Sequence, residues 1–536
     1  METKLYSYHT FMFPFQWDFI EHQRINQYSS YSARTNMKQF DKIFSKISDL
    51  KKTPFQINNS SEKYNEFTYF HPFVRKALFY TNDNDLMYYC ELEENDGEFN
   101  IEYFIDRTKN TKRTLNLKFD SICMHLYETG VGVVSYNISN FNYPDKEDIL
   151  KINEFGRRIY PQYLKNDDRL ASKGTFLPEK ISGKIGNLNF SDDFSSYNSS
   201  LTIDSVFLPP DHIKKVFGYK DNDKLGDNGM TFVFRDEDER KGTVRIKQIT
   251  DDRMFFLCYY ENADLVNKLA NKKNKEKNIK PKEIIYSYEL DSFWYAYTFG
   301  DKDDKDPTIK DDKLQYEQIN QHSYSRWIDY KSKNDFNGSL YGMTKDSFVC
   351  LGGWDELAKH MQSMYYQMAI LCLVQRASIL RFSYEVTQVT NYVFGKRNNA
   401  FLPIKELYEN YIKFINQIYF REVTAQIQGI EMYAKFQDAM GLEKNVKDLD
   451  GEVEELFHYL DIIEQRKLNK TANLFLPIAI LTAFLGMNTL DENILKVPIS
   501  KIIPFIQSTT PISSIINIGL LIWIIFVIIK TLIPKK

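Results

Sequence analysis

Two segments that are rich in arginine and aromatic residues carry the side chains best suited to binding a charged ligand. Arg157 and Arg158 lie in the first segment, and Arg326 and Trp327 lie in the second. A guanidinium group binds phosphate oxygens through paired hydrogen bonds, and an indole ring can stack on a base. These four residues are therefore candidates for gripping a nucleotide. The alternative is that the aromatic residues form ordinary core and the arginines lie on the surface.

Residues that could catalyse a reaction do not form a recognisable motif in the sequence. It contains no GxSxG, HExxH or Walker loop, and its eight histidines are dispersed. Gly130 and Gly132 do not complete a GxGxxG loop, and the aspartate-rich stretch 300–312 lacks the glycine that an EF-hand requires. We therefore expect a protein that is not an enzyme, and we favour an exposed loop over a calcium site at 300–312.

Charge and cysteine usage narrow the class of partner. The formal net charge of the 536 residues is −3, which argues against direct nucleic-acid binding driven by bulk electrostatics. The five cysteines form no CxxC pair or metal-ligand spacing, as is typical of a reducing compartment. The first ten residues lack the charged-then-apolar layout of a signal peptide, so we expect the body of the protein to stay in the cytosol.

The elements that must position these residues begin as strands. Aromatic and β-branched runs recur between polar loops over the first 350 residues. The clearest hairpin spans 123–138 and turns at Thr129 and Gly130. We therefore expect an α/β (α+β) body over residues 1–350.

Helical spacing of apolar residues takes over after the strands. It covers 356–394 and 404–439, and it then runs from 446 or 448 to 488 without a clear break. At about 1.5 Å per residue, the last run predicts a rod of about 60 Å. We therefore expect packed helices over 351–445 and a stalk helix over 446–473.

Two apolar runs close the sequence. Residues 474–487 are almost purely apolar, and 512–533 reach the roughly 20 residues that a helix needs to cross a hydrocarbon core. Basic residues precede the first run and follow the second, so the positive-inside bias puts both termini in the cytoplasm. We therefore expect a multi-pass protein of the inner (cytoplasmic) membrane. Its expected segments are a first transmembrane helix at 474–488, an outer loop at 489–511, a second transmembrane helix at 512–533 and a basic tail at 534–536.

The end of the first apolar run carries a distinctive tripeptide. It consists of Gly486, Met487 and Asn488, and Pro477 lies nine residues before the glycine. Together with two predicted spans and a basic C-terminus, this pattern resembles the CorA family of divalent-cation channels. The residues that flank the tripeptide depart from the family, because they are not aromatic. The resemblance covers only about 450–536.

The resemblance implies a homopentamer with one axial pore. In such an assembly Asn488 would present five carboxamides at the outer mouth, and their oxygens suit a hydrated Mg²⁺, which sheds its water reluctantly. Gly486 and Met487 would shape the collar, and a helix C-cap is the structural alternative for Asn488. Leu476 and Leu468 coincide with apolar constrictions of the family, which can gate by dewetting. Ordinary packing between helices explains these leucines equally well.

The resemblance also implies control from the cytosolic side. Family members commonly close when divalent cations bridge acidic residues near the base of the stalk, and Asp448 and Asp450 are the nearest candidates here. A solvated acidic face is the favoured alternative, since more glutamates follow and the family-equivalent position is Gly451. The oversized body resembles the CorA-type effectors of type III CRISPR systems, which answer a nucleotide messenger, an S-adenosylmethionine–AMP conjugate.

These inferences lead to one expected function and one alternative. The expected function is passive passage of divalent cations, above all Mg²⁺, through a homopentameric channel controlled by its enlarged body. The alternative is a membrane effector of a type III CRISPR defence system that the nucleotide messenger activates. The implied partners are further copies of this chain, the lipid bilayer, divalent cations and, for the effector, a nucleotide second messenger.

Overall fold

A computed structural model describes most of the chain. The described residues are 4–21, 37–82, 86–106, 108–159, 177–194, 210–218, 230–233, 242–249, 251–274, 284–332, 335–336, 338–395 and 401–486. The chain divides into two compact units. Unit 1 comprises 1–395 and 406–450, and unit 2 comprises 396–405 and 451–536.

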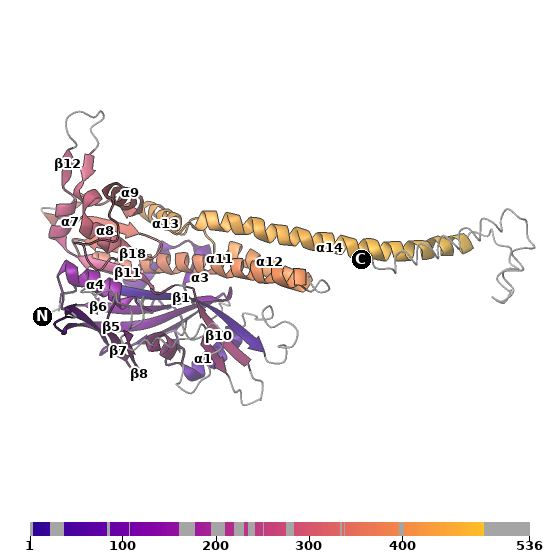
Figure 1. Ribbon diagram of the computed structural model, residues 1–536, viewed down its shortest axis with the longest axis horizontal. Coiled ribbons are helices and arrows are strands. Elements are labelled where there is room, and N and C mark those ends of the chain that lie inside the picture. The colour runs from indigo at the N-terminus through magenta and orange to yellow at the C-terminus, as the bar shows by residue number, and fades with distance from the viewer. Residues whose placement is uncertain are drawn as a thin grey trace, which may run out of the picture. The chain divides into compact units, whose positions relative to one another are not determined.

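One large sheet forms the centre of unit 1 (Figure 1). Fourteen of the described strands join it: β1 (Ser7–Glu21), β2 (Lys51–Lys52), β3 (Met87–Glu93), β4 (Glu98–Asp106), β5 (Thr111–Tyr127), β6 (Val131–Asn140), β7 (Lys180–Ile185), β8 (Leu188–Asp193), β9 (Met230–Val233), β10 (Gly242–Gln248), β11 (Phe255–Glu261), β14 (Ser323–Tyr324), β17 (Ser339–Met343) and β18 (Ser347–Gly352). Two separate ribbons pair β12 (Lys272–Asn274) with β13 (Ile284–Tyr286) and β15 (Lys331–Ser332) with β16 (Asp335–Phe336).

The order of the strands puts β1 in the middle of the sheet. The main path is β14-β17-β18-β11-β1-β6-β5-β4-β7-β8, with β10 and β9 attached through β1, and β3 and β2 attached through β5. Strands β11 and β18 run parallel, whereas the other paired strands in the described part of the sheet, such as β1 with β6, are antiparallel. The expectation of a mixed α/β body is confirmed.

The predicted hairpin is confirmed as β5 and β6. The two strands pair up to Tyr127 and Val131, and Gly130 in the turn adopts a φ of 79°, a left-handed conformation that favours glycine. All ten residues of β6 are buried. Both faces of the sheet are therefore covered at this strand.

Helices cover the two faces of the sheet, and neighbouring residues of β1 show which helix covers which face. His9 points to α4 (Lys146–Gly156), where its Nδ1 lies 2.7 Å from Asn153 Oδ1. The opposite face, which carries Thr10, contacts α11 (Met364–Gly395), because Tyr366 of α11 donates to Ser135 on that side of β6. The sheet therefore lies between two helical layers.

The remaining helices complete the described part of the chain. They are α1 (Met37–Ile47), α2 (Ser61–Tyr69), α3 (Pro72–Leu78), α6 (Asp211–Lys214), α7 (Ala263–Leu269), α8 (Ser292–Phe299), α9 (Asp312–His322), α10 (Glu356–Gln362), α12 (Phe401–Gln417), α13 (Ile427–Ala439) and α14 (Leu442–Gly486), with 3-10 turns η3 (Lys215–Phe217) and η4 (Ser287–Leu290).

The helical half of the chain differs from the prediction in its boundaries. The run predicted at 404–439 is two helices, α12 and α13, and the long helix α14 begins earlier than expected, after Gly441 at a φ of 65°. The predicted boundary at 350 lies within unit 1, because α11 packs on β1 and β6. Helix α14 has 45 residues, or about 68 Å of helix, and passes from unit 1 into unit 2.

The predicted membrane architecture is wrong. Within the described part of the chain, no helix combines the length and the apolar character that crossing a bilayer requires. The first predicted span, at 474–488, falls on the end of α14, whose apolar part is shorter than roughly 20 residues and follows the charged Lys467 and Lys470. This finding overturns the two-span fold class, the multi-pass inner-membrane location and the transmembrane-channel description. The segments predicted at 489–511, 512–533 and 534–536 lie outside the described residues.

Candidate functional site

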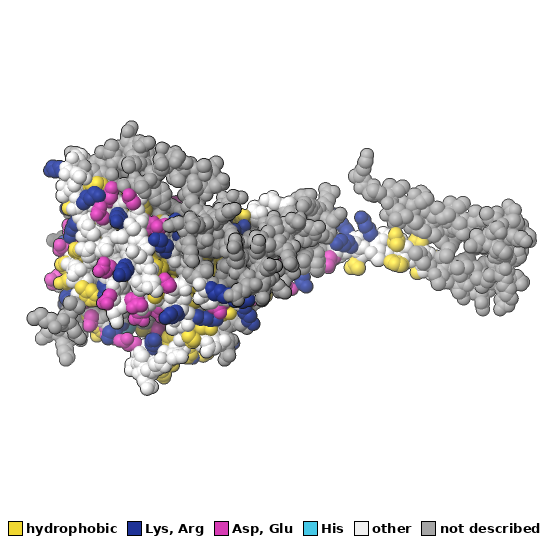
Figure 2. All heavy atoms as spheres, turned by 90° about the horizontal axis from the view of Figure 1, so that it is seen from below, with side chains coloured by type: hydrophobic (Ala, Val, Ile, Leu, Met, Phe, Trp, Pro, Cys, Tyr) yellow, Lys and Arg dark blue, Asp and Glu magenta, His cyan; other side chains and the backbone are white. Residues whose placement is uncertain are grey.

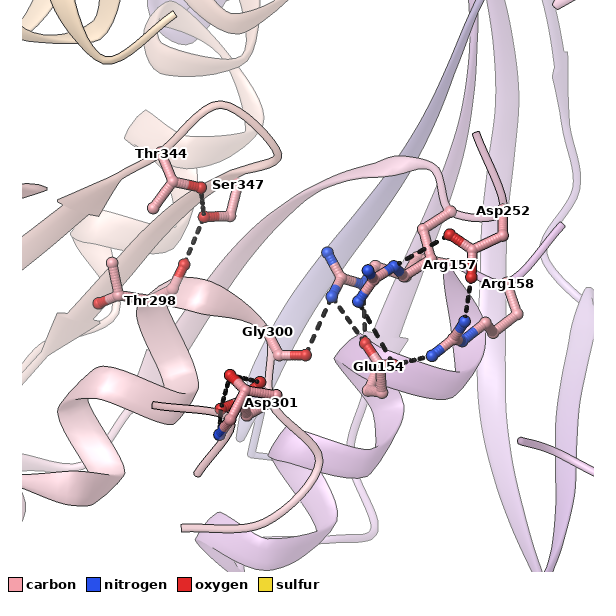
Figure 3. A network of polar contacts seen from close by, with 11 residues as sticks. Glu154, Arg157, Arg158, Asp252, Thr298, Gly300, Asp301, Thr344 and Ser347 are labelled. Atoms are coloured by element: carbon pink, nitrogen blue, oxygen red, sulfur yellow. Dashed lines mark hydrogen bonds and ion pairs between the residues drawn. The ribbon is translucent and has the colours of Figure 1, made fainter. Parts of the chain in front are cut away.

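The first predicted pair of arginines lies at the C-terminal end of α4, inside unit 1 (Figure 3). Arg157 donates to Glu154 Oε2 at 2.6 Å and to the carbonyl oxygen of Gly300 at 2.9 Å. Arg158 donates to Asp252 Oδ2 at 2.5 Å and also to Glu154 Oε1. Both arginine side chains are buried. Internal carboxylates therefore neutralise the two guanidinium groups.

The electrostatics of this network favour a structural role. Burial raises the pKa of Glu154, but the charges of Arg157, Arg158 and Arg253 outweigh burial and lower that pKa overall. Both guanidinium groups already bind carboxylate oxygens, so a phosphate could bind them only by breaking these ion pairs. The network fastens the end of α4 to the residues around Asp252 and Gly300.

The second predicted pair lies against α13. Arg326 donates to Glu431 Oε1 at 2.5 Å, and the indole N–H of Trp327 donates to Gln428 Oε1 at 2.8 Å. Both side chains are on the surface, and Trp327 is 40% exposed. In the described part of the chain, no hydrogen bond or ion pair joins this pair to the arginines of α4. The four predicted ligand-binding residues are therefore found as two separate pairs.

The residues predicted for a pore lie at the end of α14 or beyond it. Gly486 is the last residue of the helix, and Met487 and Asn488 lie outside the described residues. Leu468 and Leu476, the predicted gate, are 68% and 58% exposed. Figure 2 shows hydrophobic side chains next to basic ones along this part of unit 2. Because the membrane spans are contradicted, these leucines are described only as exposed apolar residues.

The predicted acidic pair does not form a metal site within one chain. Asp448 and Asp450 are two residues apart on α14, so they lie about 200° apart around the helix axis and point in different directions. Both are exposed, and Asp450 accepts a hydrogen bond from Tyr411 at 3.1 Å. Among the described residues, no group of three or more His, Cys, Asp or Glu side chains is placed to hold a metal ion. A divalent cation that bridges this pair to a neighbouring copy of the chain, as the resemblance implies, stays a prediction.

A second buried polar group brings a cysteine and a histidine together. Cys258 Sγ lies 3.4 Å from His9 Nδ1, and Tyr297 OH donates to the same sulfur at 3.3 Å. Burial raises the pKa of Cys258 to about 12 and lowers the pKa of His9 to about 4. The pair is therefore held as a neutral thiol and a neutral imidazole, which is the form of a structural contact.

A cluster of polar side chains lies between the sheet and the helices on the α11 side. The sequence pattern did not predict this cluster. A sheet face under helices is normally apolar, because buried polar groups cost free energy unless they are paired. Here that face is polar on four neighbouring strands. The polar cluster consists of Tyr8 and Thr10 on β1, Ser135, Asn137 and Ser139 on β6, Asp120, Ser121 and Cys123 on β5, Tyr89 and Glu91 on β3, Glu66 on α2, and Tyr366 and Gln367 on α11.

Hydrogen bonds connect the strands across the polar cluster. Thr10 Oγ1 donates to Asn137 Oδ1 at 2.9 Å, and Asn137 Nδ2 donates to Ser121 Oγ at 3.0 Å. The same amide nitrogen lies 3.4 Å from Cys123 Sγ, to which Tyr89 OH donates at 3.1 Å. The strands therefore hold these side chains in one network, which fixes their directions before anything binds.

A β-bulge turns Asp120 toward the polar cluster. The register of β5 against β6 shifts between Phe119 and Ser121, so Asp120 is the extra residue. Its Oδ2 accepts a hydrogen bond from Ser139 Oγ at 2.6 Å. Bulges occur where a strand must re-aim a side chain, and they are frequent beside functional sites.

Helices α2 and α11 close over the polar cluster. Tyr366 OH bonds to Ser135 Oγ at 3.0 Å, and Gln367 Nε2 donates to Glu66 Oε1 at 3.0 Å. The other end of that amide, Gln367 Oε1, is buried and has no hydrogen-bond partner among the described residues. Buried acceptors without a partner are rare in proteins, and each one calls for an explanation.

Two carboxyl groups of the polar cluster are poorly compensated. Burial raises the pKa of Glu66 to about 7, although the hydrogen bond from Gln367 and the charge of Lys63 lower it. Burial also raises the pKa of Glu91, and Lys63 again acts in the opposite direction. Within the described part of the chain, neither carboxyl group forms an ion pair. Perturbed, uncompensated carboxyl groups of this kind are typical of binding sites.

The sequence contained one signal for the polar cluster. Ser135, Asn137 and Ser139 alternate with Tyr136 and Ile138 along β6. Such alternation predicts one buried face and one face in water. The structure instead buries the polar face under α11, which starts more than two hundred residues later, and local pattern cannot reveal so distant a partner.

Comparison with known proteins adds no relative: no protein-family model, no curated protein and no solved structure matches this chain. The resemblance to the CorA family therefore stays a prediction that rests on the residues of its C-terminal end.

Proposed function

We propose that this chain is a ligand-responsive regulatory protein, in which a small polar ligand binds at the polar cluster and α11 and α13 pass the response to α14. The observation that carries the proposal is the polar cluster. Uncompensated carboxyl groups and an unpartnered amide oxygen cost stability where helices cover a sheet. Departures from good packing of this kind concentrate at functional sites.

A connected path supports the second part of the proposal. Gln375 lies about two turns after Gln367 on α11, and its Nε2 donates to Tyr433 OH of α13 at 2.9 Å. Gln437 of α13 donates back to Gln375 Oε1 at 3.1 Å. Helix α13 is then followed directly by Gly441 and α14. A displacement of α11 by a ligand would therefore move the residues that start α14.

Assembly with further copies of the chain completes the proposal. Leu468, Phe475 and Leu476 on α14 are each more than half exposed. Exposed apolar residues on a helix favour association with an apolar partner, and another α14 offers the same residues. Passage of ions across a bilayer is not part of the proposal, because it depends on the membrane spans that are contradicted.

The first ligand to test is the nucleotide messenger that the resemblance implies, the S-adenosylmethionine–AMP conjugate. Hydrogen exchange of the full-length chain with and without the conjugate tests the proposal. We expect slower exchange in β5, β6 and α11, accompanied by altered exchange in α14. Unchanged exchange in all four elements, or protection confined to other elements, would contradict the proposal for this ligand.

A variant that separates binding from response makes the test sharper. Gln375→Met removes the hydrogen bonds that Gln375 makes with Tyr433 and Gln437 of α13 but leaves the polar cluster intact. We expect the conjugate to bind this variant within about threefold of wild type, while the change of exchange in α14 disappears. Thr387→Val, on the exposed side of the same helix, is the matched control and should behave as wild type.

A further inference from the structure

The polar cluster presents negative charge and hydrogen-bond acceptors. Three carboxyl groups, from Glu66, Glu91 and Asp120, belong to it. Lys118 pairs with Asp120 at 3.0 Å, and Lys63 is exposed on the first turn of α2. Both lysines therefore lie at the solvent edge. Among the described residues, no positively charged group forms an ion pair with the carboxyl group of Glu66 or Glu91.

Two buried atoms of this region have no hydrogen-bond partner among the described residues, and both can accept a hydrogen bond. Gln367 Oε1 accepts only, and no described residue donates to it. His125 lies beside the polar cluster, with its ring 4.9 Å from that of Tyr89, and its Nδ1 is likewise buried without a described partner. Burial lowers the pKa of His125 to about 3, so the ring is neutral and one nitrogen is free to accept. A ligand that satisfies these atoms must bring donors.

We propose that the polar cluster recognises the positively charged, hydroxyl-bearing part of an organic ligand, a sulfonium group with neighbouring hydroxyls, and that any phosphate of the same ligand lies outside the cluster. This inference rests on the proposed function, since it specifies which part of the ligand the same site holds. Glu66 from α2 accepts from Gln367, whose neighbour Tyr366 reaches Ser135 in the sheet, and Glu91 Oε1 from β3 lies 3.6 Å from Cys123 Sγ in the same network. A cation between them replaces the missing counter-charge.

The same three carboxyl groups disfavour a negatively charged ligand group in the polar cluster. A phosphate would face three carboxyl groups, and like charges at close range repel strongly where water is excluded. Phosphate sites in proteins use arginine forks or helix N-termini. Arg157 and Arg158 are buried and are paired with Glu154 and Asp252 on the other side of the sheet. Arg381 of α11 is buried as well, and it is paired with Asp18 and Glu385.

Three probes separate charge from shape. S-Adenosylmethionine carries a sulfonium, an ammonium and ribose hydroxyls; S-adenosylhomocysteine differs by one methyl group and the sulfonium charge; AMP carries a phosphate. Calorimetric titration of the full-length chain at pH 8 should give at least tenfold tighter binding for S-adenosylmethionine than for S-adenosylhomocysteine, and no measurable binding of AMP. Equal affinity for S-adenosylmethionine and S-adenosylhomocysteine would overturn the inference, as would stronger binding of AMP. No binding of S-adenosylmethionine at 1 mM, a Kd that corresponds to a binding free energy of about −4 kcal/mol, would also overturn it.

Matched variants locate the binding. Glu91→Gln removes one carboxyl charge from the polar cluster, and Glu94→Gln removes one from the exposed end of the same segment. We expect Glu91→Gln to weaken S-adenosylmethionine binding at least tenfold and S-adenosylhomocysteine binding by less than threefold, with no effect of Glu94→Gln. Glu66→Gln, which neutralises the other carboxyl group, should act like Glu91→Gln, and thermal unfolding confirms that each variant is folded. An unchanged affinity in both cluster variants would refute the assignment.

The two proposals fail in different ways. If the S-adenosylmethionine–AMP conjugate alters exchange in α14 while Glu91→Gln and Glu66→Gln leave its affinity unchanged, the proposed function stands and the inference about charge falls. If S-adenosylmethionine binds with the expected dependence on both carboxyl groups but nothing changes in α14, the inference stands and the regulatory function falls.

Discussion

Glu154 is a buried and Glu66 a half-buried carboxyl group, and their surroundings shift their pKa values in opposite directions. Three guanidinium groups around Glu154 lower its pKa, whereas burial raises the pKa of Glu66 to about 7 with only Gln367 and Lys63 to oppose it. The first is therefore a structural ion pair that is charged at neutral pH. The second is a group that gains or loses its charge near neutral pH.

Removing the charge of Glu154 should destabilise unit 1. Glu154→Gln keeps the shape of the side chain but leaves Arg157 and Arg158 without their shared carboxylate, and a broken buried ion pair costs about 3–5 kcal/mol of unfolding free energy. Urea denaturation of the full-length chain measures this loss. Asp306→Asn, which breaks the exposed ion pair with Lys310, is the control and should leave the unfolding free energy almost unchanged, because water screens that pair. Equal effects in the two variants would contradict the structural role.

Glu66 should make stability fall as the pH rises toward neutrality. Because its pKa is about 7 in the folded protein and 4.5 when unfolded, the folded state holds this proton more tightly. The contribution is therefore fully present below pH 4.5 and is lost as the pH rises to 7. The neighbouring charged groups that share its surroundings are Lys63 on α2 and Glu91 on β3.

The test of this dependence is a comparison across pH. Glu66→Gln imitates the protonated carboxyl group, so at pH 8 it should be more stable than wild type by about 1–3 kcal/mol. At pH 5 the difference should shrink toward zero. Thermal unfolding of both proteins over this range provides the measurement, and a difference that stays constant with pH would show that another group is responsible.

At the scale of elements, the junction between α13 and α14 depends on glycine. Gly441 has a φ of 65°, a backbone conformation that is strained for a residue with a Cβ. It directly follows Met440, the C-cap residue of α13, and so ends that helix. Gly451 lies inside α14 with open space around the position of a Cβ. Gly441 is therefore needed for its backbone conformation, whereas Gly451 occupies a helical position with room for a side chain.

Alanine substitutions at these glycines should have opposite signs. Gly441→Ala forces an L-residue into the left-handed region and should lower the unfolding free energy by about 1–2 kcal/mol. Gly451→Ala improves helix propensity and should raise it by about 0.5–1 kcal/mol. Urea denaturation of both variants provides the comparison. If both substitutions shift stability in the same direction, the cap assigned to Gly441 is wrong.

Helix boundaries show where sequence pattern succeeded and where it did not. Glycine chemistry correctly placed the β5–β6 turn, and apolar spacing correctly predicted helix over 356–394, but the structure divides this run at Ser363 into α10 and α11. The break between α12 and α13 was missed, because no Gly or Pro marks it. Tertiary contacts make that break: the Val423 carbonyl accepts from the His71 backbone N–H, and Thr424 Oγ1 donates to the Tyr69 carbonyl. Such partners, more than three hundred residues away, leave no local signal.

At the scale of the whole molecule, the α/β character could be predicted and the candidate site could not. Strand runs and turn residues report on their own neighbourhood, so the hairpin was recognisable. The polar cluster draws on β1, β3, β5, β6, α2 and α11, and its residue types, such as Ser135 and Asn137, are ordinary where the chain meets water. The predicted nucleotide-binding arginines have the right chemistry for anions, but Glu154 and Asp252 neutralise the pair on α4.

Assembly of the whole chain should depend on the exposed apolar part of α14. We expect the purified full-length protein to sediment as an oligomer. Phe475→Ser combined with Leu476→Ser should raise its dissociation constant by about 100- to 10,000-fold, since each of the two buried apolar side chains contributes about 1.5–3 kcal/mol. Asn469→Ser combined with Asn473→Ser, on the same helix, is the control. A monomer at every concentration would contradict self-association.

The central place of β1 in the sheet has a consequence for how the protein is made. Strand β1 ends at residue 21, but one of its three partner strands, β11, ends at residue 261, about 240 residues later. A ribosome adding roughly 5–20 residues per second needs on the order of 12–50 s to supply that neighbour. During this interval the apolar residues of β1 have no complete sheet to enter. Newly made chains should therefore depend on chaperones that bind extended apolar segments until residue 261 has emerged.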